Sequence, residues 1–195
     1  MRIDPHGTPP LEVTDVSVVY RENDGANFTV ERAEVQDKAT GNRFSLHYAS
    51  VKDGKTGAVC MVLHKDRLLL AKHWRVSIGE WEWEFPRGMG DSSESAEQTA
   101  VRELREETGL HAELTDVRRL GYIHADTGVL KDDIAVVLLK IPDATIPEST
   151  HDWELKDPLW LLPAEVETMI ADNEIRDGIT LAAWSLWQAA CRRQL

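Results

Sequence analysis

The amino-acid sequence predicts an α/β fold: an α/β/α sandwich with a mixed sheet, preceded by a small antiparallel β unit. Segments with the two-residue alternation of strands are mixed with two stretches, 95–108 and 177–193, that carry the signals of helices. Helices that flank a set of strands in this way favour a layered sandwich. We expect residues 1–50 to form the N-terminal β unit and residues 51–195 the larger second domain.

Three short runs near the N-terminus alternate apolar and polar residues, as antiparallel strands do. They are Val16–Tyr20, Phe28–Val35 and Arg43–Ser50. Turn-forming residues separate them, Asn23-Asp24-Gly25 after the first run and Gly41-Asn42 after the second. A unit of this size is too small to hold a core alone, so we expect it to pack against something.

The second domain begins with a predicted strand pair, Ala58–Leu63 and Arg67–Lys72. Trp81–Pro86 is short and aromatic, which indicates the end of a further strand. Val117–Ile123 and Ile134–Ile141 are also predicted strands. The last is almost wholly apolar, so we expect it to be buried.

Helix signals are strongest at Ser95–Thr108. Ser95 and Gln98 form a capping box, and Gly109 stands where a glycine ends a helix. Towards the C-terminus, loop 142–158 is longer than the usual connection, and such loops are often functional.

Three further elements are predicted after this loop. Leu159–Leu162 is a predicted short strand, and Pro163 begins a helix that runs to about Asp172. Asp177 caps the last helix, whose apolar residues form one face.

Composition and charge argue against several classes of protein. No apolar stretch approaches the length of a membrane span, and residues 1–10 lack the apolar core of a secretory signal. The two cysteines, Cys60 and Cys191, are placed as in a reduced cytoplasmic protein rather than a disulfide scaffold. The formal net charge is −12 and no basic stripe is visible. We therefore expect a cytoplasmic protein with neither nucleic acid nor membrane as partner.

The segment Gly88–Leu110, GMGDSSESAEQTAVRELREETGL, carries the chemistry. Residues three and four apart share a face of a helix, so Glu103, Glu106 and Glu107 converge within one turn. Hard divalent cations with oxygen ligands offset the repulsion between such carboxylates. A pair of glutamates alone most often marks only a solvated helix face, so the spacing of the whole segment decides.

This spacing resembles the Nudix box: glycine, five residues, glutamate, seven residues, then Arg-Glu-apolar-x-Glu-Glu-x-Gly-apolar. The match holds at every specified position, and a chance match is on the order of 10⁻⁹ per window. The chain is therefore identified as similar to the Nudix hydrolase superfamily, and the sandwich expected above is the Nudix-type fold. In the box, Glu94 would brace the loop that precedes the helix.

The resemblance implies roles for the box residues. Glu103 and Glu107 would be direct ligands of Mg²⁺, with Mn²⁺ as the alternative, and Glu106 would share the metal cluster. The carbonyl of Gly88 would complete the coordination, and Arg102 would hold a box glutamate by a salt bridge. The cations would neutralise a diphosphate and activate the water that attacks it.

The residues around the box resemble the ADP-ribose pyrophosphatase subfamily. In residues 57–90, an apolar strand pair leads to the aromatic-arginine step Trp74-Arg75 and then to Trp-Glu-apolar-Pro-x-Gly at 83–88. Residues 173–183 are similar to that subfamily's last helix. The implied reaction is hydrolysis of ADP-ribose to AMP and ribose 5-phosphate, with ADP-sugars or GDP-sugars as alternative substrates.

Several residues are candidates for contacts with this substrate. Arg75 and Arg87 could bind phosphate, and the alternative for each is a surface ion pair. Shortly after the box the subfamily usually has a proline followed by glycine; here only the glycine, Gly128, is kept. Four aromatic residues could stack on a base, although core packing is the alternative for each: Tyr20, Phe28, Trp81 and Trp83.

Attack by water also needs a proton acceptor, and cation-bound glutamates are poor bases. The resemblance implies an acidic residue on the loop before the last strand. The candidates, in order, are Glu154, Asp152 and Glu148, because Glu154 is nearest to the strand and has the longer side chain. If none serves, Glu106 is the remaining candidate.

Two other functions stay open at this point. One is a housecleaning pyrophosphatase for nucleoside triphosphates; the other is a non-catalytic sensor of nucleotide metabolites, which the complete box disfavours. The net charge of −12 disfavours RNA decapping.

The resemblance also implies a homodimer in which the N-terminal β units, residues 1–50, exchange across the interface.

Overall fold

The computed structural model forms two compact units. It describes residues 7–23, 27–54, 57–91, 93–143 and 155–193. The first unit comprises residues 1–54 and 126–132, and the second comprises 55–125 and 133–195. In the described part of the chain, no helix combines the length and the apolar character needed to span a membrane.

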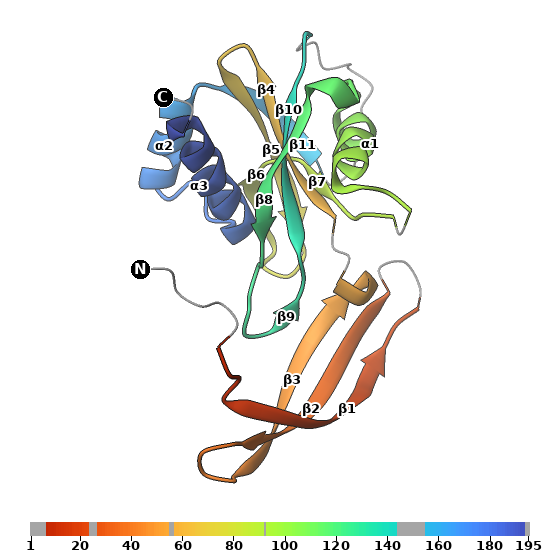
Figure 1. Ribbon diagram of the computed structural model, residues 1–195. Coiled ribbons are helices and arrows are strands. Elements are labelled where there is room, and N and C mark those ends of the chain that lie inside the picture. The colour runs from red at the N-terminus through yellow and green to blue at the C-terminus, as the bar shows by residue number, and fades with distance from the viewer. Residues whose placement is uncertain (1–6, 24–26, 55–56, 92, 144–154, 194–195) are drawn as a thin grey trace. The chain divides into compact units, whose positions relative to one another are not determined.

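The first unit is a four-stranded sheet in the order β1-β2-β3-β9 (Figure 1). Its strands are β1 (Leu11–Arg21), β2 (Phe28–Asp37), β3 (Arg43–Val51) and β9 (Leu130–Lys131). The first three are antiparallel neighbours, so the predicted N-terminal β unit is confirmed. The two-residue strand β9 pairs parallel with β3 and was not predicted. It comes from a segment far along the chain and has no strand pattern of its own.

A bulge in β1 gathers the apolar residues of this sheet on one face. Val13 and Val16 are three residues apart, so regular alternation would place them on opposite faces. The register shifts between Val13 and Asp15, and Val13 then lies opposite Val35 while Val16 lies opposite Ala33. Because Ala33 and Val35 are two residues apart in β2, both valines share their face.

The second unit contains a seven-stranded mixed sheet in the order β11-β5-β4-β10-β8, with β6 beside β5 and β7 beside β4. The strands are β4 (Ala58–His64), β5 (Arg67–Arg75), β6 (Glu80–Glu84), β7 (Arg87–Gly88), β8 (Val117–Ile123), β10 (Ile134–Lys140) and β11 (Leu155–Leu161). Strands β4 and β10 are parallel and the other pairs are antiparallel.

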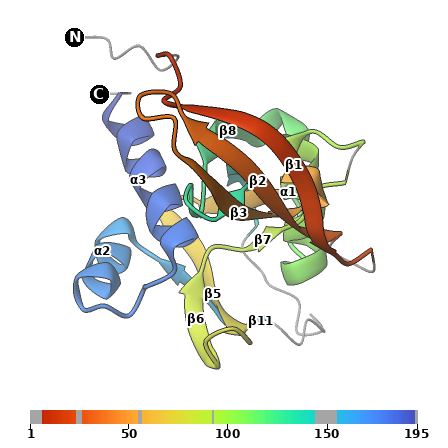
Figure 2. The ribbon, with the colours of Figure 1, turned by 90° about the horizontal axis from the view of Figure 1, so that it is seen from below.

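Helices cover both faces of this sheet, as Figures 1 and 2 show. Helix α1 (Ala96–Thr108) covers one face, and α2 (Pro163–Ala171) and α3 (Gly178–Arg192) cover the other. Two short 3-10 helices, Lys52–Gly54 and Leu114–Asp116, lie in connections. The predicted α/β/α sandwich with a mixed sheet is therefore confirmed.

Strand β4 shows how one sequence serves two cores. Ala58, Cys60 and Val62 belong to the core under α1, whereas Val59 and Met61 belong to the core under α2 and α3. All five are at most 1% exposed. A strand covered on both faces has no polar side to alternate with, which explains its continuous apolar run.

Strand β11 begins earlier than predicted. It starts at Leu155, although the sequence pattern indicated Leu159. The register against β5 shifts between Lys156 and Leu159. Within that shift, Asp157 has a φ of 51° and Pro158 has no N–H to donate. An irregularity of this kind breaks the two-residue alternation, so the pattern failed to reveal the first half of the strand.

Candidate active site

Helix α1 is held at both ends by local contacts. The Ser95 hydroxyl accepts from the Gln98 backbone N–H at 3.2 Å, and the Gln98 side chain accepts from the Ser95 N–H at 2.8 Å. Gly109 ends the helix with a φ of 70°, and its N–H donates to the Arg105 carbonyl. The predicted caps are confirmed, and they set where each glutamate of the box lies.

The three glutamates of the box differ in burial. The side chains of Glu103 and Glu107, four residues apart on α1, are only 11% and 13% exposed. The Glu106 side chain is 59% exposed. Two carboxylates therefore turn into the protein beside β5 and β7, while the third borders solvent.

Arg102 connects the residues of the box. Its Nη1 donates to Glu103 Oε1 and to Glu106 Oε2, each at 2.8 Å. Its Nε donates to Glu94 Oε1 at 2.9 Å, and its Nη2 donates to the carbonyl oxygen of Met89 at 2.8 Å. One guanidinium thus joins the loop before α1 to the helix itself.

Burial and ion pairing act in opposite directions on these carboxyl groups. Burial raises the pKa of Glu103, although Arg102 opposes the rise. Hydrogen bonds from Arg102 hold the pKa of Glu94 below its usual value, and the same contacts raise the pKa of Arg102. With Glu106 and Glu107, the box has four carboxyl groups for one guanidinium. This excess of negative charge favours the binding of a cation.

Two glycines allow this packing. A Cβ on Gly88 would lie 1.9 Å from the Glu103 carboxylate, so any larger residue would displace that carboxylate from its place beside β7. Gly57 has a φ of 101°, and a Cβ there would lie 2.0 Å from the Gly88 carbonyl oxygen. Gly57 was not predicted as a site residue, because nothing local to it shows that another strand comes so close. The Gly88 carbonyl as a metal ligand stays a prediction.

The two arginines predicted to bind phosphate meet on one buried carboxylate, Glu84, which is 0% exposed. Arg75 donates from Nε to Glu84 Oε1 at 2.6 Å and from Nη2 to Oε2. Arg87 donates from Nε to Glu84 Oε2 at 2.8 Å and reaches Asp177 Oδ1 at 3.4 Å. Their side chains stay 28% and 21% exposed, so neither arginine is fully buried.

His73 and Glu82 were not among the predicted site residues. They lie directly opposite each other in β5 and β6, so their side chains point to the same face of the sheet. His73 is 2% exposed, and its Nε2 lies 3.9 Å from Glu107 Oε2. The alternation of side chains along a strand could have indicated that His73 is buried. His73 follows Leu69 and Ala71 at two-residue spacing, so it shares their buried face.

The donor groups suit a divalent cation. Within the described part of the chain, no three acidic, histidine or cysteine side chains already converge on one point. Arg102 binds Glu103 and Glu106 through its own guanidinium. This accounts in part for the distance between the carboxylates. The carboxylate oxygens are donors that hard cations prefer. Both ring nitrogens of His73 are buried and have no hydrogen-bond partner among the described residues, so the site has polar atoms for a cation to satisfy.

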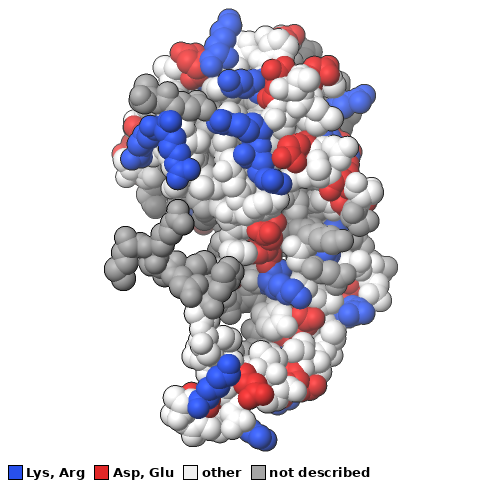
Figure 3. All heavy atoms as spheres, viewed as in Figure 1, with Lys and Arg blue, Asp and Glu red and all other residues white. Residues whose placement is uncertain are grey.

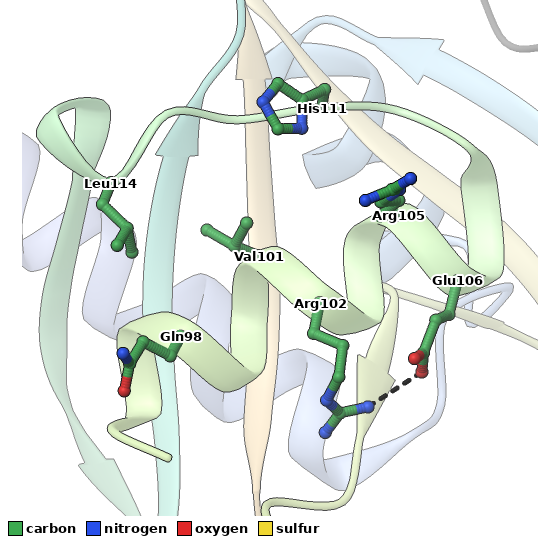
Figure 4. Close-up of a pocket in the computed structure, with 7 residues that line it drawn as sticks. All are labelled: Gln98, Val101, Arg102, Arg105, Glu106, His111 and Leu114. Carbon is green, nitrogen blue, oxygen red and sulfur yellow. Dashed lines mark hydrogen bonds and ion pairs between the residues drawn. The ribbon is translucent and has the colours of Figure 1, made fainter.

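A surface hollow of about 550 Å³ lies on the outer side of α1 (Figure 4). Its lining combines apolar Val101 and Leu114 with polar and charged side chains, among them Arg102 and Glu106. The dashed line in Figure 4 marks the pair between Arg102 and Glu106, which therefore belongs both to the box and to the wall of the hollow.

Four further predicted site residues lie outside α1 and the loop before it in the sequence. Glu148, Asp152 and Glu154 lie outside the described residues, so their role stays a prediction. Gly128 lies in the first unit, where its N–H donates to Asp126 Oδ1 at 2.8 Å.

The four aromatic candidates for base stacking contact other side chains. Trp81 packs edge-on against Trp74, with ring centroids 5.5 Å apart. Trp83 packs against the core under α2 and α3, and Tyr20 lies 6.2 Å from Phe28. The position of Trp83 agrees with core packing, whereas Tyr20 is 53% exposed and does not lie in a core.

Charged side chains of both signs are mixed on the molecular surface drawn in Figure 3. Lys and Arg side chains are interspersed there with Asp and Glu rather than gathered in one basic area.

Comparison with known proteins connects this arrangement to a family. The chain matches the family model of the NUDIX domain over residues 54–183. An uncharacterized Nudix hydrolase of Schizosaccharomyces pombe is 36% identical over 127 residues, which are 65% of this chain and 60% of that protein. The ADP-sugar pyrophosphatase of Mus musculus is 41% identical over 54 residues, 28% of this chain and 25% of that protein. The chain thus spans less than two thirds of the length of these curated relatives.

A solved structure shares the fold over nearly the whole chain. It is the crystal structure of an ADP compounds hydrolase, with a TM-score of 0.76 and 20% sequence identity. The similarity covers 95% of this chain and 96% of that one. At this identity the likeness shows the fold, and it agrees with the predicted Nudix-type sandwich.

Proposed function

This chain belongs to the NUDIX domain family, and from that premise we propose that it hydrolyses the diphosphate bond of a nucleoside diphosphate linked to another group. The observation that carries the proposal is the box itself. Glu103 and Glu107 are turned inward on α1 while Arg102 ties the helix to the preceding loop. On an acidic surface helix that binds no cation, these carboxylates would lie in solvent.

The proposed substrate is ADP-ribose, cleaved to AMP and ribose 5-phosphate, with ADP-sugars and GDP-sugars as alternatives. The names of the mouse ADP-sugar pyrophosphatase and of the ADP compounds hydrolase support a substrate of this class. The arginine pair supports it too. Glu84 fixes the guanidiniums of Arg75 and Arg87 in one place, and two fixed guanidiniums can bind the oxygens of adjacent phosphates.

The proposed cofactor is Mg²⁺, with Mn²⁺ as the alternative. Glu103, Glu107 and the carbonyl of Gly88 would hold the cation, and Glu106 would approach it from the solvent side. When bound, such a cation neutralises the diphosphate and makes water a better nucleophile. Arg102 holds Glu94, Glu103 and Glu106 beside the loop, and Glu103 and Glu106 would turn from its guanidinium towards the cation when it binds.

The proton acceptor is proposed to be Glu154, followed by Asp152 and Glu148, on the loop before β11. Glu154→Gln, Asp152→Asn and Glu148→Gln test them one at a time. Loss of the base should lower turnover by roughly 10²–10⁴-fold with little change in substrate binding. If all three variants keep normal turnover, Glu106 takes the role.

We also propose that the chain forms a homodimer through the first unit. Five large apolar side chains on one face of its sheet are 43–58% exposed: Val13, Val16, Val18, Phe44 and Leu46. They surround Ala33 and Val35, which are themselves buried. A second copy of the chain would cover this apolar face, and a face of this kind on a small sheet indicates an interaction surface.

Cys60 and Cys191 are free thiols, which agrees with the cytoplasmic location that we propose.

One experiment tests the proposed reaction. The purified chain is incubated with Mg²⁺ and ADP-ribose, ADP-glucose, GDP-mannose, NADH, diadenosine polyphosphates or nucleoside triphosphates, and the products are separated by chromatography. We expect AMP and ribose 5-phosphate from ADP-ribose at the highest rate. Preference for nucleoside triphosphates would show a housecleaning enzyme instead, and no hydrolysis of any compound would overturn the proposal.

A further inference from the structure

One cluster of buried polar atoms is not explained by the box alone. Neither ring nitrogen of His73 has a hydrogen-bond partner among the described residues, and the buried Oε2 of Glu82 has none either. His73 projects from β5 towards α1, where Glu107 Oε2 is 3.9 Å from its Nε2. Glu82 lies directly across from His73 in β6.

Leaving these atoms without partners is unfavourable. A buried polar group that makes no hydrogen bond costs about 1–3 kcal/mol, and native proteins contain few of them. A separation of 3.9 Å is too long for a direct hydrogen bond between His73 and Glu107. A bound group that interacts with the His73 ring nitrogens and Glu82 Oε2 would remove this cost.

The geometry suits a cation between the two side chains. Ligand atoms at about 2.1 Å from one cation are about 3.0 Å apart when adjacent and about 4.2 Å apart when opposite. The distance between Nε2 of His73 and Oε2 of Glu107 lies within this span. Neighbouring Glu82 can then accept a hydrogen bond from Nδ1, as carboxylates do for metal-bound histidines.

We propose that His73 is a nitrogen ligand of the cation that Glu107 binds, with Glu82 orienting its ring. This inference rests on the proposed function, because it adds a ligand to the same cation. Imidazole nitrogen favours transition metals, whereas Mg²⁺ prefers oxygen. The site therefore binds Co²⁺ more tightly than an all-oxygen box would, and Mg²⁺ gains little from His73.

The test compares the binding of Co²⁺ and Mg²⁺ to the full chain by isothermal titration calorimetry. His73→Gln keeps a polar side chain but removes the imidazole. We expect it to weaken Co²⁺ binding by at least about 10-fold, because changing a residue that only orients a metal ligand already costs about 10–100-fold. Mg²⁺ binding should change much less. His64→Gln is the matched control, because His64 is a half-buried histidine of β4 whose Nδ1 already lies 3.1 Å from the carbonyl oxygen of Ile141.

A second measurement does not depend on the folding of a variant. In the Co²⁺-loaded chain, proton NMR should show a strongly shifted exchangeable N–H signal from one directly bound histidine, retained in His64→Gln. Equal weakening of both cations in His73→Gln, or no shifted histidine signal in the wild-type chain, would overturn the inference while leaving the proposed hydrolase intact. Failure of the wild-type chain to bind either cation would instead contradict the proposed function.

Discussion

Around α1, charged side chains are buried and held by one another, whereas on the sheet of the first unit apolar side chains stay exposed. Glu103 is 11% exposed and bound to Arg102, and Glu84 is 0% exposed and bound to two arginines. In contrast, Leu46 is 44% exposed on a sheet face made mostly of apolar side chains. Each region reverses the usual distribution of polar and apolar residues.

The difference shows what each region lacks. Buried carboxylates in excess over their arginine partners require a cation to balance their charge. Exposed apolar side chains on one sheet face require another apolar surface. We therefore propose that a small ligand completes the second unit and a protein surface completes the first, so substitutions in the two regions should affect different measurements.

The largest effect is expected at the buried carboxylates of α1. Glu107→Gln and Glu103→Gln should each lower turnover by roughly 10³-fold or more, because loss of a metal ligand removes several kcal/mol of transition-state stabilisation. The thermal midpoint of the metal-free chain should change little. Steady-state rates with Mg²⁺ as the only cation measure the effect, and Glu97→Gln on the same helix is the control. Full activity in either variant would contradict the proposed site.

A smaller effect is expected when the anchor of the two arginines is removed. Glu84→Gln leaves Arg75 and Arg87 without their shared carboxylate, which should lower the free energy of unfolding by about 3 kcal/mol. The Michaelis constant should rise, because the guanidiniums are no longer fixed. Urea unfolding and initial-rate measurements test both statements. An unchanged Michaelis constant together with lower stability would limit Glu84 to a structural role.

In the first unit the effect should appear in assembly. Leu46→Lys places a charge in the apolar face, and the leucine side chain is worth about 1.5–3 kcal/mol when buried. Light scattering should show the mass fall from twice the chain mass of 22.0 kDa to that mass. Ser17→Lys, on the opposite face of β1, is the control and should remain a dimer. A wild-type chain that is already monomeric would refute the proposed dimer.

The smallest effect concerns the pH dependence of stability. Arg102 holds the pKa of Glu94 below its ordinary value of 4.5, so this carboxylate stabilises the folded chain above that pH. The stabilisation is lost as the pH falls through the lowered pKa. Glu94→Gln should therefore cost about 1 kcal/mol at neutral pH and progressively less below pH 4.5. Urea unfolding at several pH values measures the difference; a cost that does not shrink in acid would mean that the ion pair is not its source.

The sequence by itself determined the elements whose signals are local. The capping box of Ser95 and Gln98 and the glycine stop at Gly109 defined α1, since the groups that satisfy a helix end lie within a few residues of it. The spacing of the box glutamates placed Glu103 and Glu107 on one face for the same reason, because helical periodicity needs no tertiary contact.

Only the tertiary structure decided which distant residues meet. The pairing of β5 with β6 brought Glu82 to His73, and the approach of β7 to the start of β4 left no room for a Cβ on Gly57 beside the Gly88 carbonyl oxygen. Strand register sets such contacts, and a shift of one residue would turn each side chain to the other face. Arg75 was predicted from the sequence as a phosphate contact, but its ion pair with the buried Glu84 was not. That pair depends on the register between β5 and β6, which no local sequence pattern reveals.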